Sequence, residues 1–229
     1  NMEMPVKGFG QCPVVDYNKE ILNAADGIRS AKIPSRMSTR PLNDAETSWR
    51  ISSPETIAEF SATGYFFART IREALNIPVG LIEANKGGSR VESWLDEDNL
   101  KKYTKEDLDS ATMKDRFQWD FHYPLLWHNA TFNPILNYTV KGIIYYQGCS
   151  NVGDPAGQYT DRLKLLVEQW RRDFKEGDIP FYFVQIAPYV YGDGIEGTSG
   201  AKLREQQFNA TKVIPNSGIV CTQDLVYAH

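Results

Sequence analysis

The sequence has few of the residues that mark metal sites, disulfide frameworks and membrane spans. Its 229 residues include three cysteines, Cys12, Cys149 and Cys221, which show no metal-type spacing and cannot all pair with one another. No apolar run approaches the roughly 20 residues needed to cross a bilayer, so we expect no membrane helix. The sequence also lacks an excess of positive charge. Its net charge is −4 and both signs are interspersed, so we expect no nucleic-acid partner.

The chain begins with Asn1 rather than Met, and no charged leader or apolar signal core follows. We therefore expect a segment of a longer polypeptide, truncated at both ends, with any secretion signal upstream. The composition, 41% hydrophobic and 24% charged, is typical of a globular protein. Residues 1–229 are long enough to form one domain with one large core.

Strand-like and helix-like segments alternate along the chain, which predicts an α/β fold with a parallel sheet covered by helices on both faces. The expected strands are 28–33, 79–84, 141–147, 180–187 and 217–222, and the expected helices are 17–25, 61–75, 96–113, 129–137, 159–174 and 201–213. A further helical start is predicted at Ser52–Glu55 from its cap residues and Pro54.

Two of these helices have a clear apolar stripe. In the first, Phe67, Ala68, Ile71 and Leu75 recur at three- and four-residue spacing and are expected to face the core. In the strongest helix the expected core face is Tyr159, Leu163, Leu166, Val167, Trp170 and Phe174, with Asp161, Lys164, Glu168 and Arg171 elsewhere.

The stretch Lys141–Asn151 is the centre of the sequence. It begins as a buried-strand pattern and changes at Gly148 into a polar turn with an amide, a thiol, a hydroxyl and a second amide. Ligands of open α/β sheets bind at the carboxyl ends of the strands. The sequence therefore predicts a site at this turn.

Two common catalytic motifs fit this turn poorly. A nucleophile elbow needs Gly two residues after its Ser, and Val152 occupies that position after Ser150. A cysteine hydrolase needs a His beside its thiol, and only His122, His128 and His229 exist. We expect Cys149 to be a small buried thiol packed beneath a loop, and His122 and His128 to be packed or surface residues.

A second turn, Gly87-Gly88-Ser89, follows the expected strand 79–84. Two glycines allow a sharp turn that directs N–H groups toward one point, as an oxyanion or phosphate receptor requires. An ordinary strand-to-helix turn explains the same pattern equally well.

Together, three stretches resemble the bacterial sialate O-acetylesterase and acetylxylan esterase group of the SGNH hydrolases. Asn1-Met2-Glu3-Met4-Pro5 is similar to the end of that family's Gly-Gln-Ser-Asn-Met-Glu-Met block. Residues 81–94 resemble its Gly-Gly-Ser/Thr block, and residues 145–151 its Tyr-Gln-Gly-Glu-Ser-Asn block. The resemblance implies a flavodoxin-like three-layer α/β/α sandwich and hydrolysis of acetyl esters on a sugar.

The resemblance also implies roles for particular residues. The nucleophilic Ser would directly precede Asn1, on a central strand upstream. The backbone N–H of Gly88 and the side-chain amide of Gln147 would stabilise the oxyanion, while Asn151 would add a donor or brace the loop. His229 is the candidate general base, although the family's Asp-x-x-His-Pro block is not matched between Asp224 and His229, and the true His could follow the sequence.

The remaining implications concern the substrate. Asn1, Ser89, Trp94 and Tyr146, with Tyr145 beside it, are the expected substrate-binding residues, and packing in the core is the alternative for the aromatic ones. An acetylated sugar or polysaccharide is the expected partner, no metal or cofactor is implied, and a secreted or periplasmic location follows from the family. Cys149 replaces the family's usual Glu. This leaves two alternative functions: a non-catalytic carbohydrate-binding member, or a cysteine hydrolase that uses Cys149.

Overall fold

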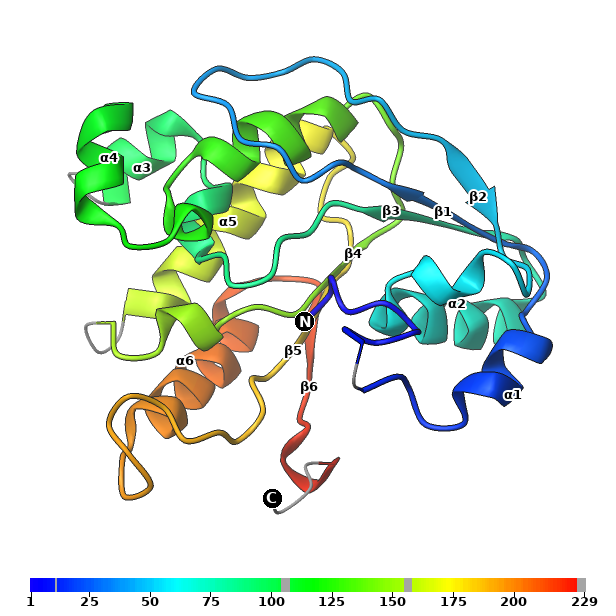
Figure 1. Ribbon diagram of the computed structural model, residues 1–229. Helices are drawn as coiled ribbons and strands as arrows, with labels where there is room; N and C mark the ends of the chain where they lie inside the picture. The colour runs from blue at the N-terminus through cyan, green and yellow to red at the C-terminus, as the bar shows by residue number, and fades with distance from the viewer. Residues whose placement is uncertain (11, 104–107, 155–157, 226–229) are drawn as a thin grey trace. The chain divides into compact units, whose positions relative to one another are not determined.

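The computed structural model describes residues 1–10, 12–103, 108–154 and 158–225, and these residues form an α/β fold. The chain divides into two units, one formed by Asn1–Ser35 with Asp44–Gly87 and the other by Arg36–Asn43 with Gly88–His229. Each unit contains a three-stranded sheet (Figure 1). The strands are β1 Ile28–Lys32, β2 Trp49–Ile51, β3 Val79–Glu83, β4 Ile143–Tyr145, β5 Phe181–Val184 and β6 Ser217–Val220. The helices are α1 Tyr17–Leu22, α2 Ala62–Leu75, α3 Glu97–Tyr103, α4 Ser110–Arg116, α5 Gln158–Phe174 and α6 Ser199–Val213.

The sheet of the first unit has the order β2-β1-β3. Strands β1 and β3 are parallel, with Ile28 opposite Val79 and Lys32 opposite Glu83. The third strand, β2, is antiparallel to β1, which corrects the expectation of a purely parallel sheet. The three residues of β2 are not buried, so the strand needs no apolar run. For this reason its sequence has no pattern that would predict a strand.

Helix α2 packs on this sheet through a face that matches the predicted one only in part. Its buried residues are Ala62, Gly64, Tyr65 and Ala68, whereas Phe67 is 38% exposed and Leu75 is 60% exposed. Small residues allow the helix to approach β3 closely, and a Cβ added at Gly64 would lie 3.5 Å from the Leu81 side chain. The expected stripe was therefore right for Ala68 and wrong for Phe67 and Leu75, because the packing face combines small residues with Tyr65.

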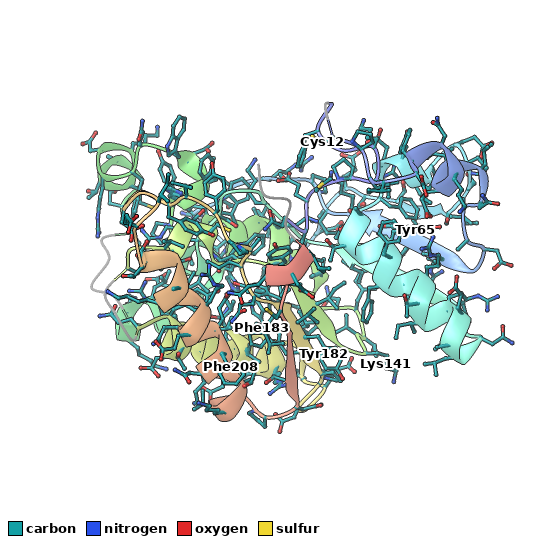
Figure 2. All side chains as sticks on the ribbon, turned by 90° about the horizontal axis from the view of Figure 1, so that it is seen from below. Cys12, Tyr65, Lys141, Tyr182, Phe183 and Phe208 are labelled. Atoms are coloured by element: carbon teal, nitrogen blue, oxygen red, sulfur yellow. The ribbon has the colours of Figure 1, made fainter. Side chains whose placement is uncertain are left out.

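The sheet of the second unit has the order β4-β5-β6, and all three strands are parallel. Phe181 and Phe183 of β5 are buried, whereas Tyr182 between them is 46% exposed (Figure 2). This alternation is that of a strand with one face against the core. The strands predicted in this unit are confirmed to within a few residues.

Helix α5 contacts both α6 and α3, and α6 contacts β6 (Figure 1). All six apolar residues predicted for the core face of α5 are buried. Arg171, expected outside this face, is also buried, and its guanidinium donates hydrogen bonds to the carbonyl oxygens of Ile179, Pro215 and Asn216. A buried arginine is tolerated here because its donors are satisfied by backbone acceptors.

Three other predicted helices differ in detail. The segment 96–113 contains α3 and the start of α4 rather than one helix, and 129–137 contains a π-helical turn, His128–Phe132, followed by a 3-10 turn, Asn133–Ile135. The start expected at Ser52–Glu55 leads only to a 3-10 turn, Ile57–Glu59. Within the described ranges, no helix combines the length and the apolar character that crossing a membrane requires.

The N-terminus of α2 gives a stability prediction. The Ser61 side chain accepts a hydrogen bond from the Gly64 N–H at 3.2 Å and so caps the helix. We expect Ser61→Ala to lower the free energy of unfolding by about 1 kcal/mol, because the Gly64 donor loses its partner in a buried position. Chemical denaturation followed by circular dichroism measures this. Thr63→Ala, in the same helical turn, is the control and is expected to change stability by less than about 0.5 kcal/mol; equal effects of the two variants would contradict the capping role.

Candidate active site at the ends of two strands

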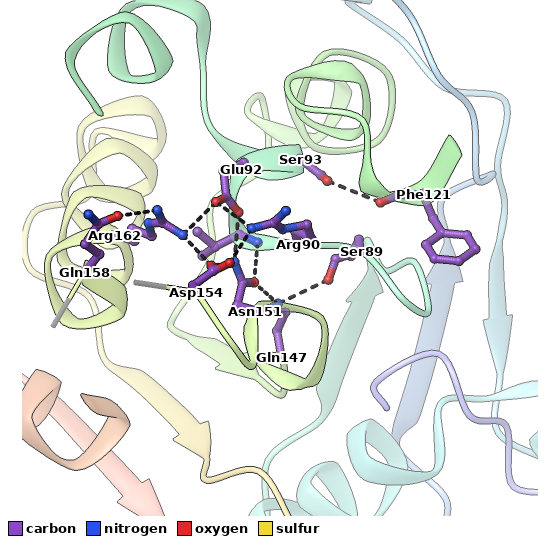
Figure 3. Close-up of polar contacts among 11 residues, drawn as sticks. Ser89, Arg90, Glu92, Ser93, Phe121, Gln147, Asn151, Asp154, Gln158 and Arg162 are labelled. Atoms are coloured by element: carbon purple, nitrogen blue, oxygen red, sulfur yellow. Dashed lines mark hydrogen bonds and ion pairs between the residues drawn. The ribbon is translucent and has the colours of Figure 1, made fainter. Parts of the chain in front are cut away.

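Gly88 and Ser89 of the first turn and the residues of the second turn belong to the second unit, where they contact one another. The Ser150 hydroxyl donates a hydrogen bond to the Gly88 carbonyl oxygen at 2.7 Å. The Gln147 side-chain amide donates to the Ser89 carbonyl oxygen at 3.1 Å, as Figure 3 shows. Gln147 follows β4, and residues 149–151 form a 3-10 turn. Two polar turns separated by about 60 positions in the sequence thus form one candidate site.

The Gln147 side-chain amide has a fixed orientation. Its Oε1 accepts hydrogen bonds from the Tyr145 hydroxyl at 3.0 Å and the Tyr159 hydroxyl at 2.9 Å. Burial raises the pKa of both tyrosines above the ordinary value, so each remains a protonated donor. The Nε2 group donates to the Ser89 carbonyl oxygen and to Asn151 Oδ1 at 2.7 Å. The amide nitrogen therefore faces the Gly88-Ser89 turn.

Gly88 and Gly148 are required by their backbone conformations. Gly88 has φ of +77°, and a Cβ there would lie 2.8 Å from the Phe121 ring. Gly148 has φ of +144°, and a Cβ there would lie 2.8 Å from the Ile186 side chain. Both values are unfavourable for residues with a side chain, so each turn depends on its glycine. In the described part of the chain, the Gly88 N–H donates no hydrogen bond.

Asn151 braces the two turns. It is fully buried, and its Oδ1 accepts from the Val91 N–H at 3.1 Å as well as from Gln147. Its Nδ2 donates to Glu92 at 3.0 Å and to Asp154 at 2.8 Å. Because both amide hydrogens are bound to carboxylates, the geometry favours bracing over oxyanion donation for this residue.

Glu92 and Asp154 are joined to two arginines in a cluster that no sequence pattern predicted. Arg162 binds Glu92 at 2.9 Å and also pairs with Asp154. Arg90 binds Asp154 at 2.7 Å and lies 3.4 Å from Glu92. Burial raises the pKa of Asp154 and lowers the pKa of Arg162, which is the usual effect of removing water from a charged group. Two positive and two negative charges nevertheless balance within the cluster.

The predicted substrate-binding residues have mixed environments. Trp94 is 5% exposed and its indole N–H donates to the Ser89 hydroxyl at 2.9 Å, so these two buried side chains hold each other. Tyr145 is also buried, which leaves little ring face for a sugar. Tyr146 is half-buried.

Asn1 belongs to the first unit, where its neighbours contact the turn that leads to Gly88. The Glu3 carboxylate accepts a hydrogen bond from the Gly87 N–H, and Asn85 donates to the Met2 carbonyl oxygen at 3.2 Å. The segment that begins at Asn1 is therefore tied to the residue that directly precedes Gly88.

The cysteine and histidine expectations have different outcomes. Cys149 is exposed rather than buried, and its sulfur lies 3.6 Å from the Tyr191 hydroxyl, so the expectation of a packed thiol was wrong. His128 is buried and lies 3.2 Å from the Gln169 amide, as expected for a packed histidine. His122 is half-buried beside the Phe121 ring. His229 lies outside the described residues.

The strands and turns define the chain as an α/β protein whose second unit has a polar candidate site at the carboxyl end of the parallel strand β4. A family model described as "Carbohydrate esterase, sialic acid-specific acetylesterase" matches residues 22–229. The chain belongs to this family, which confirms the resemblance seen in the sequence.

Individual relatives agree with the family. Sialate O-acetylesterases from Pongo abelii and Homo sapiens are each 27% identical over 209 residues, covering 82% of this chain and 38% of theirs. A solved carbohydrate acetylesterase from Xanthomonas citri superposes with a TM-score of 0.82 at 28% identity, covering 96% of this chain and 47% of its own. An Arabidopsis thaliana protein, at 18% identity and a TM-score of 0.55, shares the fold. The chain thus spans less than half the length of the first three relatives.

The charged cluster gives a second stability prediction. Arg162→Met would leave Arg90 as the remaining positive charge of the cluster beside Glu92 and Asp154, so one negative charge would lose its compensation. We expect a loss of about 3 to 5 kcal/mol in the free energy of unfolding. Arg172→Met, which removes exposed pairs with Asp96 and Asp173, is the control and is expected to lose at most about 1 kcal/mol. Urea denaturation of the three proteins decides the point, and similar losses in both variants would argue against a buried role for Arg162.

His128 gives a prediction for pH. Burial lowers its pKa to about 4, whereas an unfolded histidine titrates near about 6.5. The unfolded state therefore binds the proton first as the pH falls, and the stability present above pH 6.5 is lost progressively down to about pH 4. We expect His128 to account for about 2 kcal/mol of the stability lost between pH 7 and pH 5.

Unfolding of wild type and His128→Gln at these two pH values measures this contribution. The variant is expected to lose less stability than wild type across the interval, while His122→Gln is expected to keep most of the wild-type loss because its imidazole is less buried. A His128→Gln curve parallel to that of wild type would refute the assignment.

Proposed function

We propose that this chain carries the catalytic domain of a carbohydrate O-acetylesterase that removes acetyl groups from sugars with a serine nucleophile. The family match and the names of its relatives, sialate O-acetylesterase and carbohydrate acetylesterase, support the reaction and the class of substrate. The observation that carries the proposal is the fixed Gln147 amide, whose nitrogen faces the Gly88-Ser89 turn.

The two turns supply donors for a developing negative charge. Attack on an acetyl carbonyl produces a tetrahedral intermediate whose oxygen is anionic, and donors already in position lower the barrier. The Gly88 N–H is one donor in this proposal and Gln147 Nε2 is the other. Because both Nε2 hydrogens are engaged, Gln147 exchanges its bond to the Ser89 carbonyl oxygen, the longer of the two, for the oxyanion.

The nucleophile and the base complete the proposed mechanism. The Ser would directly precede Asn1, and the contacts of Met2 and Glu3 with Asn85 and Gly87 support a place for it beside the Asn85–Gly87 turn. A histidine, His229 or one that follows it, would take the proton of the Ser as it attacks. The acetyl-enzyme would then be hydrolysed by water activated by the same histidine.

The alternatives receive less support. No imidazole contacts Cys149 among the described residues, and His128 is engaged with Gln169, so a cysteine hydrolase lacks a visible base. The non-catalytic alternative depends on residues at the ends of the sequence: sequencing the intact gene for a Ser before Asn1 and an Asp-x-x-His block after the last strand would distinguish it. Secretion, like the choice among acetylated sugars, stays a prediction from the family.

Replacing Gln147 tests the proposed oxyanion role. In the full-length protein, Gln147→Ala is expected to lower kcat for an acetylated sugar by about 10²- to 10³-fold, because one donor to the transition state is lost. Sugar affinity is expected to change far less, since this donor acts on charge that develops only during the reaction. Steady-state kinetics on O-acetylated sialic acid and acetylated xylo-oligosaccharides measure both quantities.

The control is Gln206→Ala, which removes a glutamine of α6 that bonds Thr160 and lies outside the two turns. We expect this variant to retain wild-type kcat. If Gln147→Ala reduces kcat and affinity by the same factor, Gln147 acts in binding and the oxyanion assignment fails.

A further inference from the structure

A pair of aromatic side chains, the half-buried Phe121 and the exposed Trp119, lies next to Gly88 of the first turn. The Phe121 ring is the group that a Cβ at Gly88 would meet, at 2.8 Å. Trp119 stacks on Phe121 with ring centroids 5.7 Å apart and an angle of 8° between the ring planes. All three residues belong to the second unit.

Trp119 is unusual among the tryptophans of this chain. Its side chain is 51% exposed, whereas Trp94, Trp127 and Trp170 are at most 5% exposed. An exposed indole places a large apolar area in contact with water, which is unfavourable. Tryptophans on protein surfaces are accordingly enriched at binding sites. Stacking on Phe121 covers part of the Trp119 ring and leaves half of the residue's surface open.

The pair is held in place by the backbone around it. The His122 N–H donates to the Trp119 carbonyl oxygen at 3.1 Å, which forms the 3-10 turn Asp120–His122. The Ser93 hydroxyl donates to the Phe121 carbonyl oxygen at 3.3 Å and ties this turn to the segment 91–94 beside Ser89 (Figure 3). The two rings therefore belong to the same supported structure as the oxyanion turn, and binding a ligand there requires little further ordering.

The chemistry of an acetyl ester then determines what fits this pair. The acetyl carbonyl is joined to the sugar through a single bridging oxygen. When the acetyl oxygen accepts a hydrogen bond from the Gly88 N–H, the sugar ring therefore lies beside the residues that touch Gly88. A pyranose presents C–H groups on its faces and hydroxyls at its edge. The C–H face can pack on an aromatic ring while the hydroxyls stay in water.

We propose that Trp119 and Phe121 form the sugar-binding platform of this site, with the C–H face of the acetylated pyranose stacked on the Trp119 indole. This inference rests on the proposed function, because it takes the Gly88 N–H as the donor that fixes the acetyl group. It assigns to the aromatic pair the role that the sequence suggested for Trp94 and Tyr145, whose rings are buried.

The test compares esters with and without a sugar in the full-length protein. For Trp119→Ala we expect kcat/KM on the acetylated sugar to fall about tenfold more than kcat/KM on ethyl acetate, mainly through KM. A tenfold change corresponds to about 1.4 kcal/mol. Trp119→Phe keeps a ring and is expected to retain more than half of the wild-type preference for the sugar ester. The control is Phe208→Ala, which removes an exposed aromatic side chain of α6 and is expected to leave both values at wild-type level (Figure 2).

Equal falls on the two esters, or no fall on the sugar ester, would overturn the platform. A binding experiment separates this failure from failure of the proposed function. Saturation-transfer NMR with the deacetylated sugar is expected to show contact between the C–H face and wild type that is lost in Trp119→Ala. If wild type hydrolyses neither ester but this contact is present, the esterase proposal fails and the platform stands. If wild type is active and the contact is absent, the platform fails alone.

Discussion

The side-chain amide of Gln147 is the interaction on which the candidate site depends. Two tyrosine hydroxyls fix its oxygen, and this leaves the nitrogen directed at the Ser89 carbonyl and Asn151. An amide that could flip would present oxygen or nitrogen to a substrate with similar ease. Tyr145 and Tyr159 hold it in one orientation, because burial raises the pKa of each phenol, so each keeps its proton and donates it to the amide oxygen.

The charged cluster behind the turns extends this constraint. Removing Arg162, Glu92 and Asp154 from water is unfavourable, and their mutual attraction offsets that loss only if every partner is in place. Asn151 joins the cluster to Gln147, so the orientation of one amide is coupled to four charged side chains. The net stabilisation from the charged cluster is therefore small, and its main effect is to hold the two turns in one geometry.

Two wrong expectations share a physical cause. Phe67 and Leu75 follow helical spacing with Ala68 as well as Tyr65 does, and only packing within the first unit selects Tyr65 and leaves Phe67 and Leu75 exposed. Cys149 has the size and polarity of a core residue, yet the 3-10 turn that begins with it directs the thiol outward. In both cases local pattern allows two orientations, and packing against distant segments decides between them.

The sequence by itself determined the α/β class, most strands and helices, and the two turns at residues 87–89 and 147–151. These features depend on local periodicity, on glycine and on short motifs, which are written in consecutive residues. Tertiary structure alone decided that Arg162 completes a cluster with Glu92 and that Phe121, on which Trp119 stacks, lies beside Gly88. Such contacts join residues tens of positions apart, and no local sequence pattern indicates which distant side chains will be in contact.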